Sequence, residues 1–124
     1  MLALVRDGYT VLVPAFSDSE RYDFVLDVGG RFLRVQVKTG RITANGCVSF
    51  QPRSVRHAGG IRDYRGDVDL FAVYCPANGV TYWVRPDDVG RQRCELRLRP
   101  TANGQVLGVR VAADYARRPF AAAP

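Results

Sequence analysis

The strongest constraint on the fold is a two-residue turn, Gly29-Gly30, between two segments that alternate apolar and polar side chains. The sequence YDFVLDVGGRFLRVQVKT, residues 22–39, predicts an antiparallel hairpin because a Gly-Gly pair suits the left-handed turn that joins such strands. Counting back from the turn pairs Val28 with Arg31 and, five steps further, Asp23 with Gln36. The turn therefore predicts the register of the hairpin as well as its existence.

The alternation also assigns each side chain of the hairpin to one of two faces. The apolar face, which we expect in the core, carries Phe24, Leu26, Leu33, Val35 and Val37. On the polar face Asp23 lies opposite Gln36, and Lys38 is its diagonal neighbour. A carboxylate, an amide and an ammonium group are thus expected to converge at the open end of the hairpin.

These three groups suit metal-assisted chemistry on a phosphate. Asp23 offers a carboxylate to a hard divalent cation such as Mg²⁺, and the Gln36 amide and the Val37 carbonyl offer further oxygens. Lys38 is the chain's single lysine, in a sequence with 17 arginines. A compact ammonium can orient water or stabilise charge on phosphorus in a way that a rigid guanidinium cannot. The alternative interpretation is a surface ion pair between Asp23 and Lys38, worth under about 1 kcal/mol, beside a solvated Gln36.

The stretch YDFVLDVGGRFLRVQVKTG, residues 22–40, resembles the PD-(D/E)xK nuclease superfamily, and within it the branch of group I intron-encoded homing endonucleases and related bacterial proteins. In that family an aspartate begins one core strand, and (D/E)xK or QxK lies on the next. Asp23 matches the first element and Gln36-Val37-Lys38 the second, although Tyr22 stands where proline is usual. Residues 63–84, DYRGDVDLFAVYCPANGVTYWV, resemble the second half of the family.

The resemblance implies an α/β fold with a restriction-endonuclease-like core, in which helices flank a central mixed sheet. It also implies a magnesium-dependent endonuclease that hydrolyses DNA phosphodiesters. Asp23, Gln36 and Lys38 would be catalytic, and Asp23, Gln36 and Val37 would hold Mg²⁺. A catalytically inactive nucleic-acid-binding module and an RNA-processing endonuclease remain the alternatives.

One element of the family pattern is missing at the start of the chain. Active members usually carry a glutamate on a helix before the first core strand, whereas residues 1–7 contain none. We therefore expect a truncated first helix, an impaired site unless Glu20 substitutes, and a natural product that extends upstream by about two to four helical turns, the length of an ordinary helix.

The formal net charge of +6 favours a polyanionic partner, most simply nucleic acid. Basic residues crowd into the glycine-containing segment 52–67, which we expect to be a loop. The side chains expected to contact DNA are Arg53, Arg56, Arg62, Tyr64 and Arg65. The alternative for this segment, including its lone histidine, His57, is a solvated loop.

Length and patterning set the remaining expectations. The 124 residues suit a single domain over 1–118, with a frayed tail over 119–124. Further strands are expected at 9–14, at 46–51 as a third strand of the meander, at 68–75 and 80–85 as a second hairpin, and at 94–100; residues 109–118 are expected to form a short helix or an irregular tail. Three scattered cysteines predict buried thiols, and the lack of a long apolar run or a signal peptide predicts a cytoplasmic protein without membrane contact. Whether it forms a homo-oligomer stays open.

Overall fold

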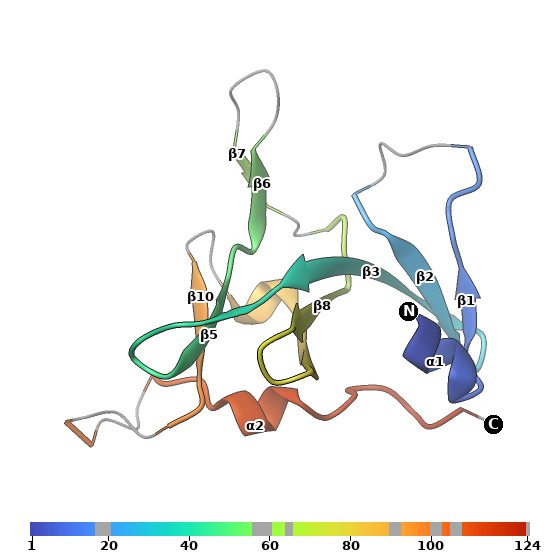
Figure 1. Ribbon diagram of the computed structural model, residues 1–124. Coiled ribbons are helices and arrows are strands. Elements are labelled where there is room, and N and C mark those ends of the chain that lie inside the picture. Colours follow the sequence, from blue (N-terminus) through green and yellow to red (C-terminus); the bar gives the residue numbers. More distant parts are fainter. Residues whose placement is uncertain are drawn as a thin grey trace.

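The structure is a computed structural model that describes residues 1–16, 21–55, 61–63, 66–89, 93–99, 103–104 and 108–123 (Figure 1). Its helical elements are short: α1 (Leu2–Arg6), a 3₁₀ turn η1 (Pro86–Asp88) and α2 (Ala112–Tyr115). Its strands are β1 (Thr10–Leu12), β2 (Phe24–Val28), β3 (Arg31–Thr39), β4 (Arg41–Ile42), β5 (Cys47–Phe50), β6 (Arg53–Val55), β7 (Ile61–Asp63), β8 (Leu70–Cys75), β9 (Val80–Val84) and β10 (Cys94–Arg97). Within the described ranges, no helix has the length and apolarity that crossing a membrane requires.

The main sheet has five strands in the order β1-β2-β3-β8-β9. The β2–β3 hairpin has the predicted register, from Val28 opposite Arg31 to Phe24 opposite Val35. Gly29 and Gly30 both have positive φ angles, 61° and 87°, as the two-residue turn requires. β3 pairs with β8 in parallel, and every other pair in this sheet is antiparallel. The expected mixed sheet of a restriction-endonuclease-like α/β fold is thus confirmed, with few helices around it.

A second sheet of three strands, in the order β10-β5-β4, packs against one face of the main sheet. Val48 and Leu96 from this sheet join Phe71, Val73 and Val84 from the main sheet in one buried cluster. β5 was expected to be the third strand of the β2–β3 meander, and this expectation is wrong. The chain leaves the main sheet at Gly40, and β8 takes the place beside β3 instead.

The other face of the main sheet is covered by α1 and the C-terminal segment, which runs from α2 toward α1 in Figure 1. Alternate residues of β8, such as Leu70 and Ala72, point to this face, so β8 is buried on both sides. Phe120 makes edge-to-face contacts with Tyr9 and Trp83, each with ring centroids 5.3 Å apart. The tail was expected to be frayed over 119–124; instead, its Phe120 packs on the core.

The basic segment also differs from the expected loop. β6 and β7 pair antiparallel, with Ser54 opposite Arg62, and this hairpin stands out from the two sheets in Figure 1. A short arginine-rich hairpin has no alternating apolar pattern, so residue patterning carries no signal for it.

Candidate active site

The candidate site lies at the open end of the hairpin, where β3 extends beyond the first residue of β2. The β2–β3 ladder stops at Phe24 and Val35, whereas β3 runs on to Thr39 beside β8. In a strand the N–H and C=O of one residue point to the same side, and successive residues alternate sides. The N–H and C=O of Val37 therefore point toward the side that β2 has left.

Asp23 fills that edge with its side chain. Its backbone N–H donates to the Val35 carbonyl at 2.8 Å, and its Oδ2 accepts from the Val37 N–H at 2.6 Å. The carboxylate thus replaces the missing strand as the partner of Val37, and Asp23 is bonded to the two residues of β3 that flank Gln36. Asp23 is exposed, so its carboxylate can also take a ligand from solvent on the open side of the strand.

Gln36 and Lys38 lie on the face of β3 that packs toward the second sheet. The parallel register aligns Gln36 with Phe71 and Lys38 with Val73, two residues of the core cluster on that face. Both polar side chains are half-buried. The Gln36 Nε2 donates to the Val37 carbonyl at 3.4 Å, a long contact that ties the amide to the open edge. The structure therefore gathers Asp23, Gln36 and the Val37 backbone at one point, with Lys38 two residues beyond Gln36 along the strand.

Val37 itself departs from the expected core position. Its side chain is 41 % exposed, although it shares a face with the buried Val35. It lines a cavity of about 660 Å³ under α1, together with Leu4 and Trp83.

The donor atoms at the open edge suit Mg²⁺ better than a softer metal. Within the described ranges, no three His, Cys, Asp or Glu side chains gather as a metal cluster. The available donors are instead one carboxylate oxygen of Asp23, the Val37 carbonyl and, after rotation of its amide, the Gln36 oxygen. Mg²⁺ commonly keeps several waters and binds through one or two carboxylates plus substrate phosphates, so this all-oxygen set fits it. Glu20, the suggested substitute ligand, lies outside the described residues.

The expected DNA-contacting residues are only partly described. Arg53 and Arg62 lie on the projecting hairpin, on β6 and β7 respectively. Their side chains, and all of Arg56, Tyr64 and Arg65, lie outside the described part of the chain. The structure therefore places the backbone of this segment and leaves its contacts as a prediction.

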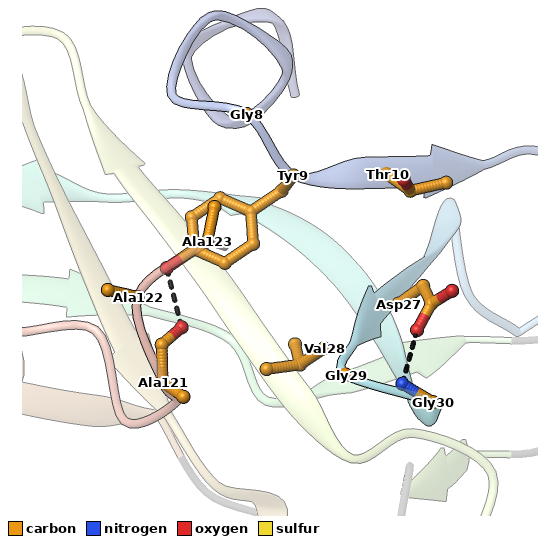
Figure 2. A pocket seen from close by; sticks show the side chains of 10 residues that line it. All are labelled: Gly8, Tyr9, Thr10, Asp27, Val28, Gly29, Gly30, Ala121, Ala122 and Ala123. Carbon is orange, nitrogen blue, oxygen red and sulfur yellow. Dashed lines mark hydrogen bonds between the residues drawn. The ribbon is translucent and has the colours of Figure 1, made fainter.

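Two other cavities lie away from this edge. One, of about 340 Å³, lies between Tyr9, the β2–β3 turn and the tail, where Tyr9 donates to the Ala121 carbonyl at 2.7 Å (Figure 2). Asp27, its one carboxylate, accepts from the Gly30 N–H at 2.9 Å and so holds the turn. This cavity carries no group poised for catalysis.

The other cavity, of about 260 Å³, contains an ion pair that sequence analysis did not identify. Asp69 accepts hydrogen bonds from the Arg34 backbone N–H at 2.8 Å and from its Nε at 3.2 Å. Burial raises the pKa of Asp69, but the hydrogen bonds from Arg34 outweigh it and lower that pKa overall. Since Asp69 precedes β8, the pair fixes the start of β8 against β3, which is a structural role.

A mixed sheet of this topology, with an aspartate just before one strand and Gln-Val-Lys on the next, has the elements expected of the PD-(D/E)xK nucleases. The sequence matches the PD-(D/E)XK endonuclease family over residues 1–118, and the chain belongs to that family. Among solved structures, it is similar to that of a bacterial homing endonuclease, I-Ssp6803I. The two share 28 % sequence identity and a TM-score of 0.63, and the alignment covers 84 % of this chain and 73 % of the other. No curated protein sequence matches the chain. The predicted superfamily, and its homing-endonuclease branch as the point of resemblance, are thereby confirmed.

Proposed function

We propose that this nuclease hydrolyses DNA phosphodiester bonds in a magnesium-dependent reaction at the edge of β3 beyond Val35. The observation that carries the proposal is the position of Asp23. Its carboxylate accepts from the Val37 N–H just before the first residue of β2, at the strand that also carries Gln36 and Lys38. DNA is the proposed substrate because the net charge is +6 and the similar solved structure is that of a homing endonuclease.

The proposed metal ligands are Asp23 Oδ1, the Val37 carbonyl and the Gln36 amide oxygen. A bound divalent ion would supply Lewis-acid polarisation of the phosphate and a more acidic water. Two features of the protein would help this site to hold the ion. The Val37 N–H fixes the orientation of the Asp23 carboxylate, and rotation of the Gln36 amide would exchange its nitrogen for its oxygen at the Val37 carbonyl.

Lys38 is proposed to orient the attacking water or to stabilise charge on the phosphate. Lys38 is half-buried and aligned with Val73, and a compact ammonium group on a flexible four-carbon stem suits this role. An arginine at this position would present a wider, planar group with donors in a fixed geometry. The proposal therefore explains why one lysine is kept in a chain that otherwise uses arginine.

The test compares Lys38→Ala, Lys38→Arg and the parental chain in plasmid nicking at increasing Mg²⁺, with Mg²⁺-induced thermal stabilisation as a second readout. We expect both variants to lose cleavage by at least about 100-fold, the scale of one acid–base or electrostatic group. Stabilisation by Mg²⁺ should persist, since neither change touches a proposed ligand. Cleavage by Lys38→Arg at the parental rate would overturn the role of lysine. DNA binding without any cleavage by the parental chain would favour the inactive binding module.

A further inference from the structure

The three-stranded sheet β10-β5-β4 has two unlike faces. Its inner face is apolar and belongs to the core, with Val48 and Leu96 both fully buried. The pairing register places the alternate residues on the outer face, where Arg41 and Glu95 flank Ser49 and Arg97 lies opposite Cys47. The outer face is therefore polar and mostly basic.

Small residues on this outer face are buried beneath arginine side chains. Ser49 is 2 % exposed and Cys47 is fully buried, although both point away from the core. The Arg93 Nη1 donates to the Ser49 Oγ at 3.3 Å, and the Arg97 Nη1 donates to the Cys47 Sγ at 3.3 Å. These arginines therefore contact the two small residues on the outer face of the sheet.

A third arginine lies over the turn before β5. A Cβ built on Gly46 would collide with the Nε of Arg99, so the guanidinium rests directly on that glycine. The Arg99 Nη2 also donates to the Ala44 carbonyl at 3.4 Å. Glycine at position 46 thus makes room for an arginine as well as forming the turn, where its φ angle is 79°.

The guanidinium groups of Arg93, Arg97 and Arg99 each donate to a neutral acceptor. These acceptors include the Ser49 hydroxyl, the Cys47 thiol and backbone carbonyls. A guanidinium has five N–H donors, and the bond from Arg93 to Ser49 uses one of them. Arginines held in this way keep their charge and their orientation, which lowers the entropy cost of binding an anion.

We propose that this arginine face, defined by Arg41, Arg93, Arg97 and Arg99, binds the backbone phosphates of duplex DNA beside the cleavage site. The inference rests on the proposed function and extends it to the path of the duplex. Arg41 follows Lys38 by three residues through Gly40, a distance of about 10 Å along an extended chain. About three base-pair steps span that distance, since each strand advances about 3.4 Å per nucleotide. Arginines on the face of a sheet suit phosphates, and contacts with phosphates add affinity without reading the base sequence.

The test measures the binding of a fluorescein-labelled 30-base-pair duplex by anisotropy, in EDTA so that no cleavage occurs, over a series of salt concentrations. The face variant is Arg41→Gln/Arg93→Gln/Arg99→Gln. The matched control is Arg6→Gln/Arg31→Gln/Arg117→Gln, which removes the same net charge from exposed positions outside the face. A third variant replaces Arg41, Arg93 and Arg99 with lysine, which keeps the charge if removal of the anchoring bonds affects folding.

The inference predicts that the slope of log K against log salt becomes shallower by about 2.7 in the face variant, since each phosphate that is no longer neutralised removes about 0.9. The control should keep the parental slope, and the lysine variant should retain most of it. Equal slopes in the face variant and the control, while the parental chain binds and cleaves DNA, would overturn the inference alone. A shallower slope on duplex RNA with an unchanged slope on duplex DNA would also overturn it, in favour of an RNA surface. Failure of the parental chain to bind DNA at all would overturn both this inference and the proposed function.

Discussion

Asp23 has two roles that a pair of substitutions can separate: acceptor for the Val37 N–H and proposed metal ligand. Asp23→Ala removes both roles, whereas Asp23→Asn keeps an oxygen that can accept from Val37 and removes only the charge. The 2.6 Å bond is charge-assisted, a class worth about 1.5–3 kcal/mol. Because the site is exposed, water can solvate an N–H that no longer has the carboxylate, which places the destabilisation at the lower end of that range.

We therefore expect Asp23→Ala to lower the free energy of unfolding by about 1.5 kcal/mol and Asp23→Asn by under about 1 kcal/mol. For a chain of 124 residues the unfolding entropy near the midpoint is about 0.26 kcal/mol/K, so the alanine variant should melt about 6 °C lower. Both variants should lose magnesium-dependent cleavage. The assay is thermal melting by circular dichroism beside plasmid nicking. Equal stability of the two variants would refute the capping role, and cleavage by Asp23→Asn would refute the requirement for a carboxylate.

Three further predictions concern the remaining parts of the molecule. Replacing the four arginines of residues 53–65 with alanine should weaken DNA binding and reduce the salt slope by about 0.9 for each phosphate that is no longer neutralised; an unchanged slope would place the DNA-binding surface elsewhere. Phe120→Ala should lower the free energy of unfolding by about 2 kcal/mol, because it removes two edge-to-face ring contacts, and urea denaturation would measure the change. The pKa of Asp69 is lower in the folded protein than in the unfolded chain. Its ionised carboxylate should therefore stabilise the fold above the unfolded pKa of about 3.9, and this stabilisation should disappear as the pH falls through the folded pKa. Asp69→Asn should flatten that part of the curve of unfolding free energy against pH.

The β2–β3 hairpin was predictable because its information is local. A Gly-Gly turn fixes which residues face each other, and the alternation from Phe24 to Val35 fixes which side is buried. Counting residues back from the same turn also predicts that Asp23 lies opposite Gln36. The bond from Val37 to the Asp23 carboxylate was not predictable, since it depends on where the β2 ladder stops rather than on residue spacing.

Sequence analysis predicted the strand at 68–75, but the pairings and contacts that it missed depend on distant partners or on single side chains. β8 pairs in parallel with β3 across a long stretch of intervening chain, and no local pattern distinguishes that partner from β5. The packing of the tail involves Phe120, which contacts Tyr9 and Trp83 from separate parts of the chain. The arginine face was missed because alternation on β5 and β10 predicts which residues face outward but not that arginines cover Cys47 and Ser49.

The central claim is that the edge of β3 beyond Val35 is a magnesium-dependent nuclease site, and plasmid nicking tests it most directly. Purified parental chain and Asp23→Asn would each be incubated with supercoiled plasmid, with Mg²⁺ and with EDTA. We predict conversion to nicked or linear DNA only by the parental chain and only with Mg²⁺. Equal cleavage by Asp23→Asn, or cleavage by the parental chain in EDTA, would contradict the claim.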